Sequence, residues 1–155
     1  MNQEPISSKE AYSKAAFICS KAEKCSPDIR KKIVSWGLEK YDAEALVDKL
    51  KDENYIDDAR YCKAYFREKF RINKWGKIKI SYYLKQKGIS DQYIQVGKNE
   101  IEDEKYIQAL LKVMKDKAKI IKSTNRFEKM GKIIRFTQNR GFEPELIHRH
   151  INSIL

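Results

Sequence analysis

Ten basic side chains and a single acidic one, Glu68, lie between Arg60 and Gly88 in the middle of the chain. Ammonium and guanidinium groups bind the phosphate oxygens of nucleic acids and the carboxylates of acidic proteins. This segment has a net charge of +9, whereas residues 1–59 have ten basic and twelve acidic residues, a net charge of −2, and residues 89–155 have thirteen and nine, a net charge of +4. The concentration of positive charge predicts a polyanionic partner. The candidate contact residues are the ten bases and one aromatic residue: Arg60, Lys63, Arg67, Lys69, Arg71, Lys74, Trp75, Lys77, Lys79, Lys85 and Lys87.

A basic segment can also be no more than the solvated face of a helix. Four of the bases recur at spacings of three, four and four residues, which places them on one side of a predicted helix. They are Arg60, Lys63, Arg67 and Arg71. Like charges on one side of a helix repel one another unless acidic residues compensate them, and this segment has only one acid. We therefore favour contact with a partner over a purely solvated face.

Aromatic residues are interleaved with these bases and allow two interpretations. Exposed rings would provide stacking platforms for the bases of a single nucleic-acid strand. Alternatively, rings with one polar end fill the seams between packed helices. We favour the second interpretation for most of them, namely Tyr61, Tyr65, Tyr82 and Tyr83. Trp75, at a predicted turn before Gly76, is the best candidate for an exposed aromatic residue.

The residue types that serve as catalytic groups form no recognisable site in the sequence. Asp57 and Asp58 are neighbours that point about 100° apart on a helix, so helix capping explains them better than a catalytic pair. His148 and His150 diverge by about 200° and cannot chelate one metal ion from a regular helix. The ATP-binding pattern GxxxxGK[ST] does not occur in the 155 residues. We expect a protein that is not an enzyme and has neither a metal nor a cofactor.

The composition favours a helical protein without a membrane span. Of the 155 residues, 41% are apolar and 35% charged, and glycine and proline are few. No apolar stretch approaches the roughly 18–20 residues of a membrane span, and residues 1–8 have no signal pattern. The three cysteines, at positions 19, 25 and 62, form no CxxC pair. We expect a cytoplasmic protein with reduced thiols.

Three glycines mark an internal repeat. Gly37, Gly88 and Gly141 lie 51 and 53 residues apart, and an apolar residue follows each. Such a residue can fold back on the helix that the glycine ends. With the helical periodicity between the glycines, this predicts an all-α fold of three tandem three-helix repeats in an elongated, curved array. The expected ranges are a flexible tail at 1–8 and repeats at 9–56, 57–101 and 102–155, the middle one basic.

Local signals predict where several helices begin. A serine before a proline and acids or serines before apolar runs predict helix N-caps at Ser26, Asp42, Asp57 and Ser90. A further helix follows Asn125, and its predicted buried side has Phe127, Met130, Ile134 and Thr137.

Several of these segments together resemble the RecX family of recombination regulators. They are YIDDARY at residues 55–61, Trp75-Gly76 before a basic helix, LKQKGI at 84–89 and FTQNRGF at 136–142. The resemblance extends from about residue 11 to the end, and the middle repeat is its most specific part. It implies a modulator of the RecA recombinase that binds in the groove of the RecA filament on DNA and generally inhibits it. The implied partners are the RecA filament and single-stranded or double-stranded DNA, and we expect a monomer.

Two other classes of function stay open at this point. A general nucleic-acid-binding helical module would act without RecA, and its affinity would fall steeply with salt. A protein–protein adaptor built from helical repeats would tolerate charge reversal at Arg67, Arg71 and Lys77. The sequence does not decide whether DNA or RecA is the main contact.

Overall fold

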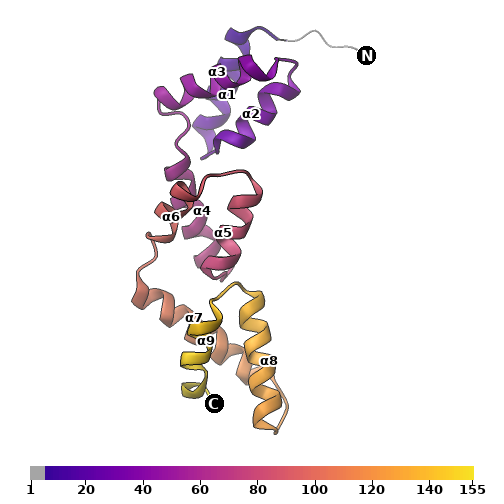
Figure 1. Cartoon of the computed structure of the whole chain (residues 1–155), viewed down its shortest axis with the longest axis vertical. Coiled ribbons are helices and arrows are strands. Elements are labelled where there is room, and N and C mark those ends of the chain that lie inside the picture. Colours follow the sequence, from indigo (N-terminus) through magenta and orange to yellow (C-terminus); the bar gives the residue numbers. More distant parts are fainter. Residues whose placement is uncertain (1–5) are drawn as a thin grey trace.

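A computed structural model describes residues 6–155, which form nine α-helices and a one-turn 3-10 helix with no strand in that range (Figure 1). The helices are α1 (Ser8–Lys21), α2 (Ser26–Ser35), α3 (Lys40–Asp52), α4 (Asp58–Arg71), α5 (Lys77–Gln86), α6 (Asp91–Lys98), α7 (Asp103–Ile120), α8 (Arg126–Asn139) and α9 (Pro144–His150), with the 3-10 helix at Ile151–Ser153. The predicted all-α fold is confirmed. No helix in the described range has both the length and the apolar composition that a membrane span requires.

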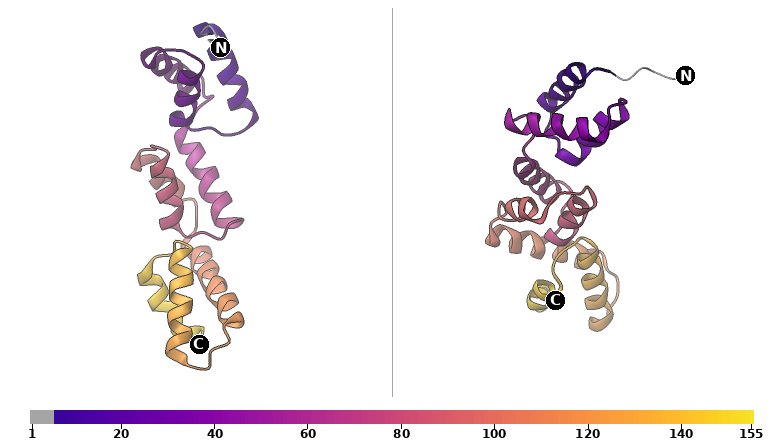
Figure 2. Two further views of the ribbon diagram at one scale, coloured as in Figure 1. Left: turned by 90° about the vertical axis from the view of Figure 1, so that its right-hand side faces the viewer. Right: turned by 45° about the horizontal axis from the view of Figure 1, so that its top comes forward.

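The helices follow one another in groups of three along the long axis of the molecule. We call α1–α3 module 1, α4–α6 module 2 and α7–α9 module 3; they lie in this order from top to bottom of Figure 1, and Figure 2 shows the same row from two further sides. We keep 9–56, 57–101 and 102–155 as the proposed limits of the repeats. The predicted tail at 1–8 lies mostly outside the described range. Its last two residues begin module 1, because Ser7 caps α1 by accepting from the Glu10 N–H at 3.1 Å and Ser8 is the first helical residue.

Each module turns at one of the three repeated glycines. Their φ angles are +101° at Gly37, +90° at Gly88 and +94° at Gly141, the left-handed region in which a side chain is disfavoured. The apolar residue after each glycine is buried, as predicted, with between 1% and 8% of its surface exposed: Leu38, Ile89 and Phe142. These turns therefore return each third helix to its own module.

One of the predicted caps forms the expected hydrogen bond, a second has the expected position, and the helix predicted after Asn125 begins with a capping bond that was not predicted. The Asp57 carboxylate accepts from the Arg60 N–H at 3.0 Å, and the Asn125 side chain accepts from the Glu128 N–H at 3.1 Å. Ser90 occupies the N-cap of α6, although its side chain makes no capping bond. Short-range spacing was sufficient for these three helix starts.

Two cap predictions are wrong. Cys25, and not Ser26, occupies the N-cap of α2, and the Ser26 hydroxyl donates instead to Asp58 in the next module. Asp42 is the third residue of α3, which begins at Lys40. A carboxylate in the first turn still interacts favourably with the helix dipole, but the prediction placed the N-cap three residues after Glu39, the residue that occupies it.

The predicted buried side of α8 is also partly wrong. Phe127 is 84% exposed, and Ile133, which the prediction omitted, is fully buried together with Thr137. Ile134 is only partly buried. The first turn of α8 thus presents a large aromatic side chain to solvent, where burial was expected.

The hydrophobic core is divided unequally among the modules. One cluster of buried side chains includes Phe66 and Leu84 of module 2 and continues into Leu110 and Phe142 of module 3. A second cluster, which includes Leu50, belongs to module 1. Modules 2 and 3 therefore share one core, which also includes Cys25 at the start of α2, whereas the rest of module 1 has its own core.

Modules 2 and 3 meet through their backbones. The Gly76 N–H donates to the Arg140 carbonyl at 2.7 Å, and the Ile78 N–H donates to the Gly141 carbonyl at 3.0 Å. A Cβ atom at Gly141 would lie 2.3 Å from the Cβ of Lys79, closer than atoms can approach. The start of α5 is thus fixed on the turn between α8 and α9.

Modules 1 and 2 meet mainly through side chains. The buried Asp58 carboxylate, in the first turn of α4, accepts from the Ser26 N–H at 2.8 Å and from its hydroxyl. The Lys87 ammonium lies 3.0 Å from the Asp28 carboxylate. The start of α2 is therefore held by a polar network between two separate cores.

Candidate nucleic-acid interface

Trp75 lies at the centre of a cluster of rings and ammonium groups near the junction of modules 2 and 3. Its ring stacks on Tyr83, with centroids 5.1 Å apart and planes 23° apart. The Lys69 and Lys79 ammonium groups lie 5.4 and 4.7 Å from its ring centroid. Trp75 is partly buried against the shared core, so the prediction of an exposed aromatic residue is wrong. We call Trp75, Tyr83, Lys69 and Lys79 the Trp75 cluster.

The turn between α4 and α5 positions this cluster. Lys74 adopts a left-handed conformation, with φ of +59°, and its ammonium donates to the Arg71 carbonyl at 2.7 Å. The Trp75 N–H then donates to the Lys69 carbonyl at 3.1 Å, which closes the turn. Because Gly76 is fixed on module 3, the cluster has a defined position between the two modules.

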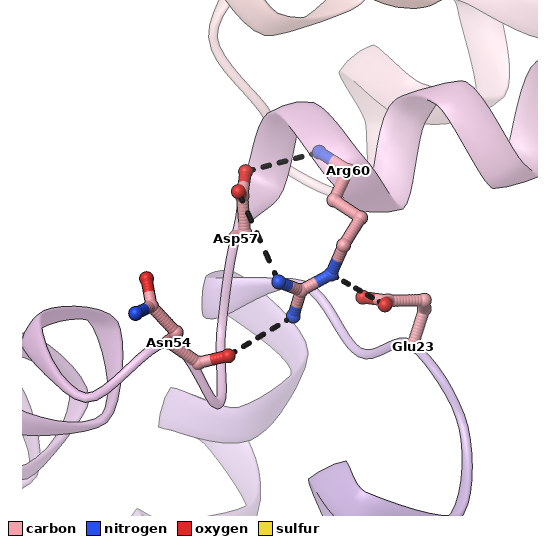
Figure 3. A network of polar contacts seen from close by, with 4 residues as sticks. All are labelled: Glu23, Asn54, Asp57 and Arg60. Carbon is pink, nitrogen blue, oxygen red and sulfur yellow. Dashed lines mark hydrogen bonds and ion pairs between the residues drawn. The ribbon is translucent and has the colours of Figure 1, made fainter.

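Arg60, the first of the predicted contact residues, joins modules 1 and 2 (Figure 3). Its guanidinium donates to the Glu23 carboxylate and, at 3.2 Å, to the Asn54 carbonyl. It also lies 4.0 Å from the Asp57 carboxylate. Glu23 and Asn54 lie in loops of module 1, so Arg60 contributes to the junction of modules 1 and 2 and its side chain is only 41% exposed. Its charge is largely satisfied within the chain.

Three more of the predicted bases have a carboxylate beside them. Glu100, after α6, lies 3.4 Å from the Lys63 ammonium and 3.8 Å from the Arg67 guanidinium. Asp91 lies 3.2 Å from the Lys85 ammonium. The acids that compensate these bases come from outside the basic segment, so the inference that it lacks acidic compensation is wrong for them.

Lys87 is the most strongly perturbed of the basic residues. Burial disfavours its charged form, but the hydrogen bond to Asp28 and the neighbouring negative charges outweigh burial and raise the pKa of Lys87. Burial likewise opposes ionisation of Asp28, yet the hydrogen bonds from Lys87 and Cys25 lower the pKa of Asp28. The pair is therefore charged at neutral pH and serves the junction of modules 1 and 2.

Five of the predicted bases have no carboxylate within 4.0 Å among residues 6–155. They are Lys69, Arg71, Lys74, Lys77 and Lys79. The Lys77 ammonium lies 4.7 Å from the Tyr106 ring centroid in module 3, and the Lys79 ammonium is 3.4 Å from the Asn139 carbonyl. All five lie near the end of α4 or the start of α5, next to module 3. The free positive charge of module 2 is thus concentrated at its junction with module 3.

The acids, cysteines and histidines considered as catalytic or metal-binding groups do not come together in a site among residues 6–155. Asp57 caps α4 and Asp58 binds Ser26, so the two acids do not form a pair that could exchange a proton. Burial raises the pKa of the Cys25 and Cys62 thiols to about 12. His148 is exposed and His150 partly buried, and no three His, Cys, Asp or Glu side chains in the described range gather as metal ligands.

Module 3 has a second basic region, which was not predicted from the sequence. Residues 112–140, which include most of α7 and all of α8, have ten basic and two acidic residues, a net charge of +8. Averaging over residues 89–155 concealed it, because the remainder of that range has three basic and seven acidic residues. A charge count in a window of 29 residues would have found both regions.

Comparison with known proteins places the chain in a family. The model of the second three-helix domain of RecX matches residues 57–96, which form most of module 2. Regulatory protein RecX of Vibrio campbellii is 31% identical over 142 residues, 92% of this chain and 88% of that protein. Regulatory protein RecX of Clostridium acetobutylicum is 32% identical over 136 residues, 85% of this chain. The chain spans only 63% of the length of that Clostridium protein.

The fold agrees with this placement. The crystal structure of RecX from Lactobacillus salivarius superposes with a TM-score of 0.88 at 20% sequence identity, and the match covers 95% of this chain and 96% of that one. At this level of identity the superposition supports the fold alone. The 31% sequence identity to the Vibrio protein extends over 92% of this chain and 88% of that protein. The chain therefore belongs to the RecX family of regulatory proteins.

Proposed function

We propose that this chain binds the RecA–DNA filament and modulates RecA, mostly by inhibiting its ATP hydrolysis and strand exchange in recombinational DNA repair. Membership of a family of regulatory proteins supports a regulatory role. The observation on which the proposal rests is the position of the free cations. All five lie near the end of α4 or the start of α5, and two of them, Lys69 and Lys79, lie over the Trp75 ring. A long filament groove could accommodate this part of the elongated array.

The contact would be electrostatic and would extend over more than one RecA subunit. Lys69, Lys74 and Lys79 have no carboxylate partner in the described range, so they can approach DNA phosphates or acidic groups of RecA without breaking an ion pair. The three modules in a row give the chain the length to contact neighbouring subunits. Inhibition would follow from occupation of the groove or from faster filament disassembly.

The test is the DNA-dependent ATP hydrolysis of RecA, measured with strand exchange while the chain is titrated at fewer molecules than RecA. Inhibition under these conditions supports a specific effect on the filament. A general nucleic-acid-binding module would act only by competing for DNA. Adding tenfold more single-stranded DNA would then raise the concentration of this protein needed for half-maximal inhibition by about tenfold, in proportion to the sites added. Unchanged hydrolysis and strand exchange would refute the proposal.

A further inference from the structure

The basic residues of module 3 line a groove between α7 and α8. Two adjoining hollows there share Lys117, Ile120 and Phe136. The hollow toward the end of α7 is further lined by Ile121, Lys122, Lys132 and Arg135. The hollow toward module 2 is further lined by Lys74, Val113, Asp116 and Arg140. We call the two hollows the α7–α8 groove; because Lys74 lines it, the groove begins at the turn that holds the Trp75 cluster.

Most cations of this groove are free. Both acids of the basic region are already paired along their own helices, Asp116 with Lys112 at 3.3 Å and Glu128 with Lys132 at 3.2 Å. Among residues 6–155, no carboxylate lies within 4.0 Å of the five remaining cations of the groove. These are Lys74, Lys117, Lys122, Arg135 and Arg140. The groove therefore has an uncompensated positive charge that the fold itself does not use.

The hollow toward module 2 has an apolar and partly aromatic floor. The Lys117 ammonium lies 4.6 Å from the Phe136 ring centroid, and the Arg140 guanidinium lies 5.1 Å from the same ring on the side of module 2. Ile120 is 67% exposed, although it lies next to this ring in the groove. Exposed apolar surface bordered by free cations suits a ligand with a charged side and a flat or apolar side.

A nucleic-acid chain fits these features better than an acidic protein segment. Its phosphates repeat at every unit, so they can contact successive cations from Lys74 past Lys117 to Lys122, while sugars and bases lie against the apolar floor. Carboxylates of a folded protein would have to be arranged along the groove by a matching surface. A nucleic-acid chain needs no such matching surface, because its phosphates are evenly spaced and no free acid lies between the cations of the groove.

We propose that the α7–α8 groove is a nucleic-acid phosphate site, continuous across the junction of modules 2 and 3 with the Trp75 cluster. This inference deepens the proposed function and rests on its claim that the chain contacts DNA. It adds a contact site in module 3 whose residues, apart from Lys74, lie outside the basic segment at Arg60–Gly88. The test omits RecA, so that the site and the regulation of RecA can fail separately.

The experiment measures fluorescence anisotropy of a labelled 30-nucleotide oligo(dT) and of a labelled duplex of equal length, over a series of potassium chloride concentrations. The groove variant combines Lys117→Gln, Lys122→Gln and Arg135→Gln. The control variant removes the same net charge from exposed lysines of module 1, by Lys9→Gln, Lys32→Gln and Lys40→Gln. Thermal unfolding of both variants confirms that they are folded.

We expect the groove variant to bind oligo(dT) about tenfold to a hundredfold more weakly near 100 mM salt, because up to three phosphate contacts are lost. The slope of log affinity against log salt should fall by about 2, since each contact with a single strand contributes about 0.7. The control variant should change affinity by less than about threefold, because salt screens charges that lie far from the DNA.

A comparable loss on the duplex assigns the site to both forms of DNA, and a loss on oligo(dT) alone assigns it to single strands. Equal affinities of the two variants for both DNAs would overturn the inference.

Discussion

The two junctions between modules are built from different groups and use their cations differently. Where modules 1 and 2 meet, Arg60 and Lys87 form ion pairs with acids of module 1, and the cores on either side are separate. Where modules 2 and 3 meet, the backbone of Gly76 and Gly141 makes the contact, and one core is continuous through both modules. Ion pairs thus contribute to the first junction, whereas the cations at the second junction have no carboxylate partner in the described range.

This difference divides the cations of the basic segment into two groups with different roles. Arg60 and Lys87 act within the fold, and replacing them would loosen the contact with module 1. The cations near the start of α5, with those of the α7–α8 groove, lie on a unit that is already held by backbone and core. Modules 2 and 3 can therefore present a fixed array of charges to a polyanion.

The largest expected effect is on the second junction, from Gly141→Ala. The φ of +94° disfavours any side chain, and the new Cβ would also collide with Lys79, so we expect a loss of about 3 kcal/mol in the free energy of unfolding. Gly37→Ala is the matched control, because Gly37 has a similar φ of +101° but is exposed at the corresponding turn. It should lose only about 1 kcal/mol. Urea unfolding measures both; equal losses would mean that the backbone contact between modules 2 and 3 adds nothing to stability.

The next largest effect is on the first junction, from Asp58→Ala. Removing this buried carboxylate leaves the N–H and hydroxyl of Ser26 without their acceptor, which should cost about 2 kcal/mol. Asp57→Ala removes only a cap and should cost about 1 kcal/mol. Because the cores are separate, the loss of amide protection against hydrogen exchange in Asp58→Ala should be confined mainly to module 1. Equal loss of protection in module 3 would contradict the separation of the cores.

The smallest effect concerns Asp28 and Lys87. Both side chains are at least one-third exposed, so Asp28→Asn should cost only about 0.5 kcal/mol at pH 7. The pKa of Asp28 is lowered in the folded state, so its contribution is present above its ordinary value of 3.8 and disappears as pH falls below that value. The pKa of Lys87 is raised, so its contribution is complete below its ordinary value of 10.5 and is lost only as pH rises beyond it.

Chemical unfolding of Asp28→Asn and the unchanged chain at pH 3, 7 and 10 tests this pH dependence. The difference between them should be present at pH 7 and 10 and should vanish toward pH 3. A difference that is independent of pH would show that the ion pair does not stabilise this junction.

Local features were predictable from the sequence, and contacts between modules were not. The glycine turns and the Asp57 cap depend on residues within four positions of one another, so spacing identifies them. The ion pair of Arg60 with Glu23 joins residues 37 positions apart, which no local pattern reveals. The same limit explains why Ser26 was predicted as a cap of its own helix although it binds Asp58 in the next module.

The candidate site was predictable only as a region. Net charge identified the segment that contains Lys69 and Lys79, but it gave equal weight to Lys63 and Lys85, whose carboxylate partners lie outside that segment. Sequence charge does not report which cations are compensated after folding, because compensation depends on tertiary contacts. The α7–α8 region was missed for the opposite reason, since distant acids were averaged with it.

The most direct test of the proposed function compares two pairs of these lysines in RecA's hydrolysis of ATP on single-stranded DNA. Lys69→Gln with Lys79→Gln removes two free cations, and Lys63→Gln with Lys85→Gln removes two paired ones, with the same change in net charge. We predict that the first variant needs at least about tenfold more protein for half-maximal inhibition, while the second stays within about twofold of the unchanged chain. Equal inhibition by all three proteins, or a greater loss in the second variant, would contradict the claim that the free cations of modules 2 and 3 form the contact with the filament.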